Sequence, residues 1–403
     1  MVIPSFSRSK SSSAEELFSI ERIDDRTAPL TFALDSFRDK SYLTHNFHPF
    51  PAKFVPQIPA TLIRRFTEFG ETVLDPFCGS GTTLVETIIA GRRAIGFDVN
   101  PIACLISRAK VHPLDNVERD QVINSVHETE FLLRELLVGK TERINSFKVP
   151  EFRNRDHWFQ PHVQRELTAV RSIIWAQPEG RVRDFLSTAF SAIIVKVSNQ
   201  DSDTRWAAVH KTVAVGATLS SFIAKAREML ERVSELAQLK PALAQVIEHS
   251  VSEPFPLTDN CVDLVVTSPP YLNSFDYYLY HKLRMFWLGF DHYPVQSREL
   301  GSRNRHCDNQ EGLETYTDGI AAFLRETTRC LKPRKVLCIV IGDAVFRNSV
   351  IDMKDLYSEL AQTAGLRLDE SFSFDQRKYT TAFTRNYKTH PKKTHVLCFR
   401  GRC

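Results

Sequence analysis

The sequence lacks the marks of secreted, membrane-embedded and zinc-binding proteins. Its eight cysteines are scattered over 403 residues, and no two form a CxxC pair, so neither a zinc site nor a thioredoxin-like motif is indicated. No apolar run approaches the length of about 20 residues that a membrane-spanning helix needs. The first residues also lack the apolar core of a signal peptide. We therefore expect a reduced, cytoplasmic protein that binds no metal.

The composition is that of a globular protein. Hydrophobic residues make up 42% and charged residues 25% of the chain, which is typical of globular domains. A net charge of +4 and a pI of about 8.5 are compatible with a nucleic-acid partner without indicating one. Residues 1–30 begin with the Ser-rich, charged stretch "SFSRSKSSSAEE" and are predicted to form a flexible arm.

Strand and helix patterns alternate in two regions that flank a mostly helical stretch. The segments "ETVLDPF" and "RRAIGFDVN" predict strands that end at Asp75 and Asp98, each followed by a helix. Strand patterns return after residue 243, and the last two, "LRLDESFSF" and "THVLCFR", predict an antiparallel pair. We expect one doubly wound, mostly parallel α/β domain formed by residues 31–112 and 243–403. Residues 113–242 then form a helical insertion.

The turn "DPFCGSGTT", Asp75–Thr83, carries the first functional signal. Gly79 and Gly81 let the backbone approach a ligand where a Cβ would obstruct it. The helix that follows offers unpaired N–H groups to a carboxylate or phosphate. Asp98 ends the next strand, where an acidic side chain can accept hydrogen bonds from ribose hydroxyls. The pattern predicts a nucleoside-bearing cofactor at the carboxyl ends of the strands.

The turn lacks residues of two other nucleotide-binding motifs, which narrows the choice of cofactor. Leu84 stands where a dinucleotide fingerprint has its third glycine, and no lysine follows Gly81 as a P-loop requires. Asp75 would repel a pyrophosphate but suits an ammonium group. S-adenosylmethionine carries an ammonium group, a carboxylate, a ribose and an adenine, so it is the predicted cofactor.

A second motif, "TSPPY" at residues 267–271, follows the apolar strand "VDLVV". Together with "DPFCGSGTT" it resembles the S-adenosylmethionine-dependent amino-methyltransferases of DNA. The Ser-Pro-Pro-Tyr form is most similar to the cytosine-N4 branch, whereas the adenine-N6 branch more often has Asp or Asn in place of Ser268. A third stretch, "HPFPAKF" at residues 48–54, resembles the family segment that lies over the cofactor. Ser250 stands where the family has an acidic residue before the catalytic strand.

The resemblance covers about residues 45–110 and 245–400. It implies a Rossmann-like class I methyltransferase fold, with an antiparallel strand near the C-terminus. It also implies methyl transfer to the exocyclic N4 amine of a cytosine flipped out of double-stranded DNA, in a restriction–modification system with a companion endonuclease. In this interpretation Ser268 Oγ and the Pro269 carbonyl accept hydrogen bonds from the amine, and Tyr271 offers a face for stacking the base.

The residues that these interpretations assign to the site are as follows. The predicted catalytic residues are Ser268, Pro269, Pro270 and Tyr271. The predicted cofactor-binding residues are Phe50, Pro51, Ala52, Lys53, Asp75, Pro76, Phe77, Cys78, Gly79, Ser80, Gly81, Thr82, Asp98, Val99 and Asn100.

Three stretches are candidates for contact with DNA. The insertion interleaves basic and aromatic residues at "FRNRDHWF" and "SDTRWAAVHK", which favours a target-recognition region, although a helical scaffold with solvated charges explains the same pattern. The stretch "SRELGSRNRH" is a basic loop, and residues 376–403 contain eight Lys or Arg and no Asp or Glu. The candidate contacts are Arg298, Arg303, Arg305, Arg377, Lys378, Arg385 and Lys388.

Other functions are less well supported. Methylation at cytosine C5 needs a cysteine nucleophile, typically after a proline, and none of the eight cysteines follows one. Three alternatives stay open: an adenine-N6 enzyme with a serine variant, an RNA guanine-N2 methyltransferase, and a non-catalytic DNA-binding protein on the same scaffold.

Overall fold

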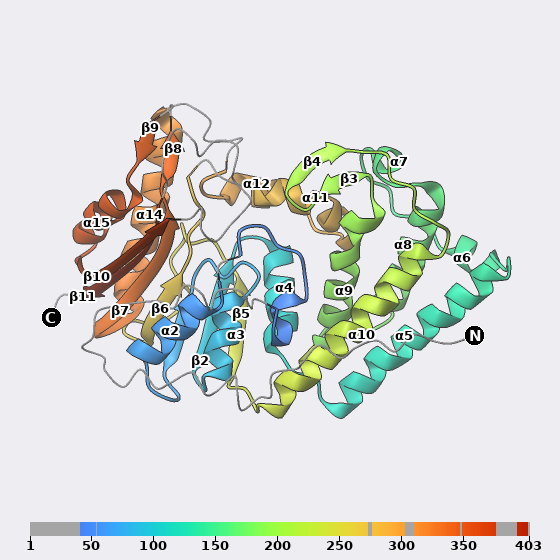
Figure 1. Ribbon diagram of the computed structural model, residues 1–403, viewed down its shortest axis with the longest axis horizontal. Coiled ribbons are helices and arrows are strands. Elements are labelled where there is room, and N and C mark those ends of the chain that lie inside the picture. The colour runs from blue at the N-terminus through green and yellow to red at the C-terminus, as the bar shows by residue number, and fades with distance from the viewer. Residues whose placement is uncertain are drawn as a thin grey trace.

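The computed structural model describes residues 41–53, 55–272, 276–302, 310–346, 349–375 and 393–401. A seven-stranded sheet with the order β10–β11–β7–β6–β1–β2–β5 forms the centre of the left half of Figure 1. Its strands are β1 (Thr72–Asp75), β2 (Arg93–Asp98), β5 (Ala244–Glu248), β6 (Val262–Thr267), β7 (Leu331–Gly342), β10 (Leu366–Asp375) and β11 (Lys393–Gly401).

Strand directions confirm the predicted topology. β5, β2, β1, β6 and β7 are parallel neighbours, whereas β11 lies antiparallel between β7 and β10. Helices lie in the connections from β1 to β2, from β2 to β5 and from β6 to β7, because two parallel strands cannot be joined by a tight turn. This doubly wound sheet with one reversed strand is the Rossmann-like class I methyltransferase fold.

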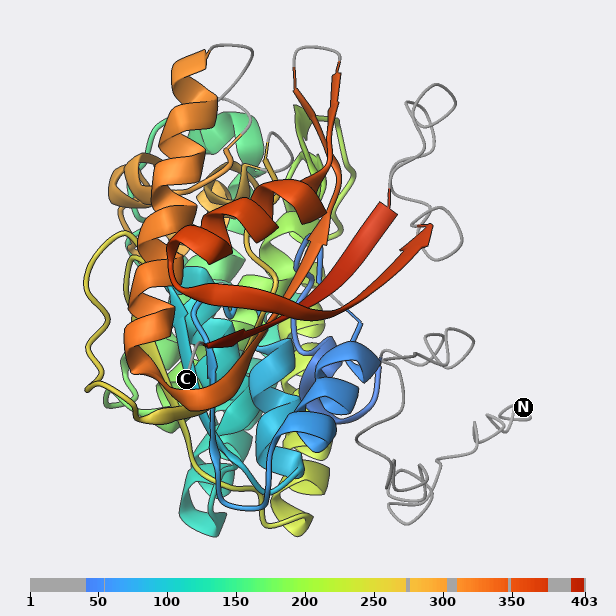
Figure 2. The same cartoon turned by 90° about the vertical axis from the view of Figure 1, so that its left-hand side faces the viewer.

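Helices cover both faces of the sheet. α2 (Gln57–Phe66) lies on one face, and α14 (Gln310–Cys330) and α15 (Met353–Thr363) lie on the other, as Figure 2 shows. Successive side chains of a strand point to opposite faces. Leu264 and Val266 of β6 therefore pack toward α2, while Val265 packs with the apolar side chains of α14 and α15. A strand buried on both faces reads as a continuous apolar run, which made β6 predictable.

The insertion shares its core with the sheet domain. Its helices are α5 (Asn116–Leu137), α6 (Glu142–Ser146), α7 (Arg155–Trp158), α8 (Pro161–Trp175), α9 (Arg181–Val197) and α10 (Ala217–Gln238). Their apolar side chains form one cluster with those of α4 (Pro101–Val111) and α11 (Tyr277–Leu288). Trp287 of α11, for example, is fully buried between Phe159 and Phe190 of the insertion. The helix after the Ser-Pro-Pro-Tyr loop is thus held by the insertion.

The structure also contains elements that the sequence patterns did not indicate. "SDTRWAAVHK" lies in a mostly helical region but overlaps an antiparallel hairpin, β3 (Gln200–Ser202) and β4 (Arg205–Ala208). A second hairpin, β8 (Ala344–Phe346) and β9 (Ser349–Ile351), follows β7. These strands have three or four residues, too few for a periodic pattern. No helix in the described ranges is long and apolar enough to cross a lipid bilayer.

Candidate active site

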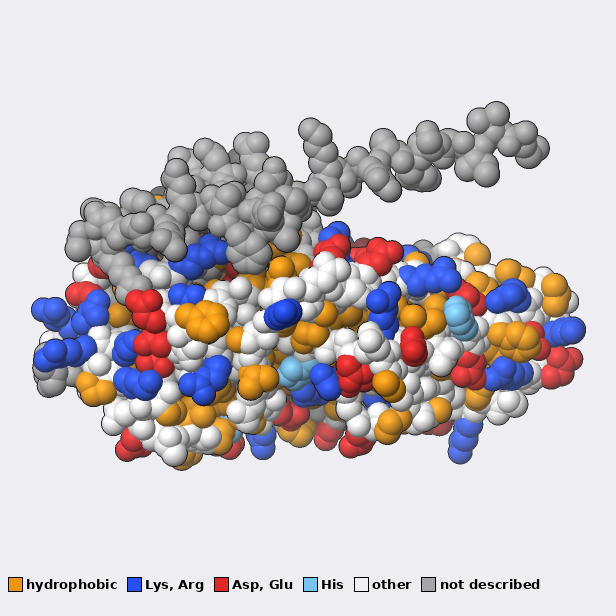
Figure 3. All heavy atoms as spheres, turned by 90° about the horizontal axis from the view of Figure 1, so that it is seen from below, with side chains coloured by type: hydrophobic (Ala, Val, Ile, Leu, Met, Phe, Trp, Pro, Cys, Tyr) orange, Lys and Arg blue, Asp and Glu red, His pale blue; other side chains and the backbone are white. Residues whose placement is uncertain are grey.

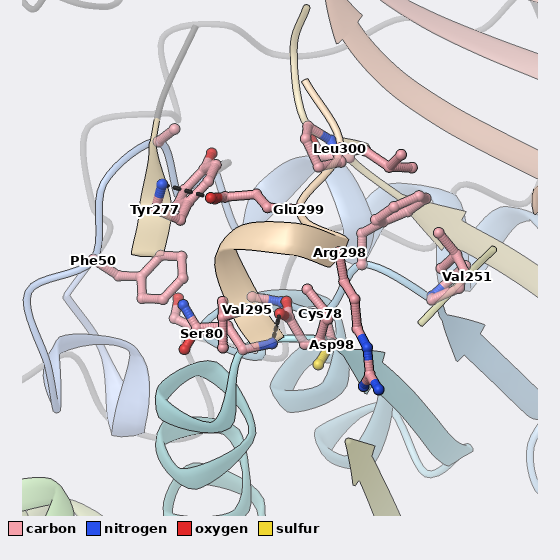
Figure 4. A pocket seen from close by; sticks show the side chains of 18 of the residues that line it. Phe50, Cys78, Ser80, Asp98, Val251, Tyr277, Val295, Arg298, Glu299 and Leu300 are labelled. Carbon is pink, nitrogen blue, oxygen red and sulfur yellow. Dashed lines mark hydrogen bonds between the residues drawn. The ribbon is translucent and has the colours of Figure 1, made fainter. Parts of the chain in front are cut away.

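A cavity opens at the carboxyl ends of β1, β2, β5 and β6 (Figure 4). It encloses about 890 Å³, counting the part that is open to solvent. In a doubly wound sheet this edge is the expected place for a ligand. The side chains and backbone that line it belong to Phe50, Ala52, Lys53, Pro76, Phe77, Cys78, Gly79, Ser80, Thr82, Asp98, Val99, Asn100, His249, Ser250, Val251, Ser268, Pro270, Tyr277, Val295, Arg298, Glu299 and Leu300.

The glycine turn forms one wall of the cavity. Gly79 and Gly81 have φ angles of +49° and +76°, in the left-handed region that favours glycine. Gly81 is the N-cap of α3 (Thr82–Ile89), so the first N–H groups of that helix follow directly. Asp98 holds the turn, because its two carboxylate oxygens accept the N–H groups of Gly79 at 2.9 Å and Asn100 at 2.8 Å.

Two buried side chains donate hydrogen bonds to the backbone of the turn. Ser107 Oγ donates to the Gly79 carbonyl at 2.9 Å, and Lys110 Nζ donates to the Ser80 carbonyl at 2.7 Å. Burial holds the pKa of Lys110 well below its ordinary value. A second lysine, Lys53, donates to the His48 carbonyl at 2.8 Å and so holds the loop that covers the cavity. The backbone of the turn is therefore fixed before any ligand enters.

Gly81→Ala is expected to lower the free energy of unfolding by about 3 kcal/mol. A left-handed alanine costs about 1 kcal/mol, and overpacking costs about 1–3 kcal/mol more, since the new Cβ would lie 2.8 Å from Ser107 Oγ and 3.2 Å from its Cα. Gly139→Ala is the control: its φ is +80° with nothing within 4 Å, so it adds only the backbone cost. Urea unfolding of both variants measures the difference, and equal losses would contradict the predicted clash.

Asp75 lies under the turn and does not line the cavity. Its Oδ1 accepts a hydrogen bond from Thr267 Oγ1 at 2.6 Å and another from the Phe77 N–H at 3.2 Å. Burial raises the pKa of Asp75 to about 6. These contacts link the ends of β1 and β6. Of the other predicted cofactor residues, Pro51 and Gly81 also lie off the cavity wall, and the remaining twelve line it.

The Ser-Pro-Pro-Tyr loop forms the opposite wall. Ser268 Oγ lies on the cavity and donates to the Val340 carbonyl of β7 at 3.0 Å. Because its proton is committed to that carbonyl, the lone pairs of the hydroxyl are left to accept from a ligand. The Pro270 carbonyl accepts from the Tyr316 hydroxyl at 3.1 Å. Among the described residues no donor contacts the Pro269 carbonyl. Pro269 itself does not line the cavity.

The aromatic wall is formed by residues other than the predicted Tyr271. Tyr271 is half-buried against the apolar cluster of α14 and α15 and does not line the cavity. Phe50 and Tyr277 do line it, and their rings stack with centroids 5.8 Å apart at 26°. Figure 4 shows both rings at the same end of the cavity. These two rings, rather than Tyr271, are placed to contact a planar group there.

Several residues that line the cavity were not among the predicted site residues. His249, Ser250 and Val251 follow β5, so their position after a predicted parallel strand was an available signal. The closing segment, residues 293–302, contains α12 (Tyr293–Arg298) and brings Val295, Glu299 and Leu300 to the cavity. Its approach to the Ser-Pro-Pro-Tyr loop depends on Gly301, where a Cβ would lie 2.9 Å from the Tyr271 carbonyl oxygen. No local pattern signals that contact.

The predicted DNA contacts are only partly within the described residues. Arg298, the last residue of α12, is exposed and lines the cavity. The others, Arg303, Arg305, Arg377, Lys378, Arg385 and Lys388, lie outside the described residues, as does the predicted arm at 1–30.

The two basic-aromatic stretches of the insertion contact each other. The rings of Trp158 and Trp206 have centroids 4.5 Å apart, and the Asn199 N–H donates to the Trp158 carbonyl at 2.8 Å. Asp203, in the turn of the β3–β4 hairpin, forms an ion pair with the buried Arg284 of α11. Figure 1 shows this hairpin beside α11 and α12 near the upper edge of the molecule. The opposite face, in Figure 3, mixes basic and acidic side chains without a patch of one sign.

A second group of titratable side chains lies at the end of β7. One ligand atom each of Asp343, Asp352 and His395 lies within 4.8 Å of the others. Asp343 Oδ1 is 2.9 Å from His395 Nε2, and Ser373 Oγ is 2.8 Å from the other ring nitrogen. Both nitrogens of His395 therefore have protein partners, and the group links β7, β10 and β11.

Known proteins are similar to this chain over much of its length. Residues 9–108 match the family described as DNA methylase. The chain is 26% identical to the type II methyltransferase M.MvaI of Kocuria varians over 398 residues, covering 84% of this chain and 85% of the relative. It is 23% identical to M.MjaII of Methanocaldococcus jannaschii, covering 85% and 78%. A shorter match of 31% over 119 residues, covering 27% and 33%, is to a tRNA (guanine(10)-N2)-dimethyltransferase of the latter organism.

Proposed function

The chain belongs to the DNA amino-methyltransferases, and from this premise we propose that it methylates the exocyclic N4 amine of cytosine in duplex DNA, with S-adenosylmethionine as the methyl donor. The observation that carries the proposal is the position of Ser268. Its Oγ lies on the same cavity as the glycine turn and Asp98, with its own proton directed to the Val340 carbonyl. An acceptor is thus held where an amine must meet the cofactor.

The residues of the cavity fit the cofactor. Asp98 is an acceptor for ribose hydroxyls, and the glycine turn at the start of α3 offers N–H groups to a carboxylate. Phe77 and Val251 give apolar surface for an adenine ring. When bound, S-adenosylmethionine supplies an electrophilic methyl group on a sulfonium. The predicted roles of Phe50, Lys53 and Asn100 in the same site are part of this proposal.

The loop acts by orienting the amine. Ser268 Oγ and the Pro269 carbonyl accept hydrogen bonds from its two N–H groups, which reduces delocalisation of the nitrogen lone pair into the ring. The lone pair would then be free to form a bond with the methyl group of the cofactor as the methyl–sulfur bond breaks, which would release S-adenosylhomocysteine, and the nitrogen would lose its extra proton to solvent. Two prolines and the bond from Tyr316 to the Pro270 carbonyl hold the loop rigid, so positioning supplies much of the barrier reduction. No covalent intermediate with the protein is needed.

The target base must leave the duplex to reach this cavity. The ring of Tyr277, which stacks on the ring of Phe50, is the aromatic surface that we assign to holding it. The serine of "TSPPY" favours cytosine over adenine, because the adenine branch more often has Asp or Asn at this place. The tRNA methyltransferase similarity supports a second candidate, guanine N2 in RNA.

The insertion is the proposed target-recognition region. Its β3–β4 hairpin lies beside the catalytic helix α11, and the buried Arg284 holds the hairpin turn through Asp203 and α9 through the Ser191 carbonyl at 3.0 Å. Phe152 of the insertion stacks on Phe286 of α11 with centroids 5.0 Å apart. Duplex bound by the hairpin would therefore be held in a fixed position relative to the Ser-Pro-Pro-Tyr loop.

Arg205→Ala is expected to weaken binding of duplex DNA about fivefold and to lower the slope of log Kd against log salt by about 1. Arg205 lies in the hairpin with its side chain 71% exposed, and its partner Asp201 is 3.4 Å away. Fluorescence anisotropy across a salt series measures both quantities. Arg232→Ala, which removes an α10 arginine paired with Glu235 at 3.2 Å, is the control. An equal effect of both variants would contradict a role for the hairpin.

The test of the proposed function is nucleoside mass spectrometry. Purified protein is incubated with S-adenosylmethionine and either mixed-sequence duplex DNA or RNA, and the products are digested and identified. N4-methylcytosine from DNA is the expected product. N6-methyladenine would keep the mechanism but change the target, and a product from RNA alone would overturn the DNA assignment. Resistance of the methylated DNA to one endonuclease would support a restriction–modification pair.

A further inference from the structure

The cavity wall carries a second acid besides Asp98, the buried Glu299 of the closing segment. Glu299 lies outside the glycine turn and the Ser-Pro-Pro-Tyr motif, in the stretch "SRELGSRNRH", and the residue is 4% exposed. Oε1 accepts the N–H of Tyr277 at 2.7 Å and Oε2 accepts that of Tyr278 at 3.4 Å, the first two N–H groups of α11. Figure 4 shows the carboxylate directed across the cavity toward Tyr277, on the side where Phe50 also lies.

Within the described ranges no cation of the protein neutralises this acid. Among the described residues no cation acts on Glu299, and none acts on Asp98, the other acid on the cavity wall. Lys53 Nζ is directed to the carbonyls of His45 and His48. Arg298, the neighbour of Glu299 in sequence, is exposed and pairs with neither acid. A buried carboxylate without a counter-charge is costly, so the cavity is suited to a cationic ligand.

Among the described residues, the groups that act on Glu299 are themselves acidic or neutral. They are the carboxyls of Asp276 and Asp98 and the phenol of Tyr277. Asp276 is held by a 2.6 Å hydrogen bond from Ser302, at the end of the closing segment. Burial raises the pKa of Glu299 to about 8. The two N–H donors of α11 act to lower this pKa, and the neighbouring carboxyls of Asp276 and Asp98 act to raise it.

Resting on the proposed function, we propose that Glu299 binds the positive charge of the methionine part of S-adenosylmethionine. Asp75 was predicted for the ammonium group, but it lies under the turn, with Thr267 and the Phe77 N–H as its partners. Glu299 is the buried carboxylate that reaches the cavity from the other side. The cofactor's ammonium or sulfonium supplies the counter-charge that the described residues do not provide, and through Glu299 it contacts both the closing segment and the start of α11.

A purely structural role would be to cap α11. Glu299→Gln separates the two roles, because glutamine has nearly the same volume and keeps one oxygen acceptor for the Tyr277 N–H, but it carries no charge. Thermal unfolding of the variant without ligand reports the capping role. Affinity for the cofactor and the number of protons exchanged on binding report the charge.

The experiment is isothermal titration calorimetry of S-adenosylmethionine at pH 7.5 in two buffers of different ionisation enthalpy. A bound cation lowers the pKa of Glu299 from about 8, so the wild type is expected to release a proton on binding, and its affinity rises with pH through this range. Glu299→Gln is expected to lose that release and to bind about 30-fold more weakly. Glu248→Gln, which changes an exposed acid at the end of β5, is expected to behave like the wild type.

S-adenosylhomocysteine, which has the ammonium but not the sulfonium, distinguishes the two cations. Equal weakening of both ligands by Glu299→Gln assigns the carboxylate to the ammonium, and selective weakening of S-adenosylmethionine assigns it to the sulfonium. Unchanged affinity and unchanged proton release in Glu299→Gln would overturn the proposal while leaving the proposed function intact. A wild-type protein that binds neither ligand would overturn both.

Discussion

Ser268→Ala is expected to reduce the rate constant of methyl transfer by about 100-fold, the usual effect of removing one transition-state hydrogen bond. The cofactor Kd should stay within about twofold, because the hydroxyl accepts from the amine that reacts and not from the cofactor. The reason lies in the local geometry. The Val340 carbonyl accepts a hydrogen bond from the Ser268 hydroxyl at 3.0 Å, so Ser268 Oγ is oriented as an acceptor before the base arrives. Single-turnover kinetics at saturating cofactor and DNA measure the effect.

Ser234→Ala is the matched control for this variant. Ser234 Oγ also donates to a main-chain carbonyl, that of Leu230 at 2.7 Å, but it lies on α10 away from the cavity. Loss of that hydroxyl should leave the rate constant unchanged. If Ser268→Ala retained wild-type turnover, the Ser-Pro-Pro-Tyr loop would not act through its hydroxyl, and the amine would have to be oriented by backbone carbonyls alone.

Asp98→Ala is expected to weaken binding of S-adenosylmethionine about 100-fold. The carboxylate has two tasks: it would accept hydrogen bonds from ribose hydroxyls, and it accepts the N–H groups of Gly79 and Asn100. Hydrogen bonds to a charged group contribute about 1.5–3 kcal/mol each, and 1.4 kcal/mol corresponds to a factor of ten. Calorimetric titration measures the Kd, and circular dichroism verifies that the variant is folded.

Two further measurements bear on the role of Asp98. Burial raises the pKa of Asp98 to about 6, so a proton is taken up as the pH falls through 6, and wild-type affinity should fall in the same range. The proton-free form is the better acceptor, which sets the sign of this dependence. Glu248→Ala is the control, because Glu248 is the register partner of Asp98 on β5 but lies outside the cavity lining. A similar loss in both variants would point to long-range charge rather than direct contact.

Much of the site could be predicted because its signals are local. Only a glycine accepts the φ angles at 79 and 81 without strain, and an acid placed at the end of the next strand is adjacent whenever two strands are parallel neighbours. Of the fifteen predicted cofactor residues, twelve line the cavity.

Other features depend on contacts between distant parts of the chain. Asp75 and Thr267 are 192 residues apart, and their hydrogen bond turns the Asp75 carboxylate away from the cavity. Tyr271 packs with the α14 and α15 cluster instead of presenting its ring. The insertion is mostly helical, as predicted. Its hairpin and the core that it shares with α11 could not be predicted from periodicity, because short strands have no clear pattern and packing partners are not encoded locally.

The sequence by itself determined the doubly wound sheet, the glycine turn and the Ser-Pro-Pro-Tyr loop, since each follows from backbone conformation, hydrophobic alternation or proline chemistry within a few residues. Only the tertiary structure decided which of two buried acids faces the cavity. Asp75 and Glu299 are both buried acids, but Thr267 and the Phe77 N–H engage the first under the turn, while the closing segment brings the second to the cavity wall. A side chain's direction at the end of a strand or helix is set by its packing partners, and these come from elsewhere in the chain.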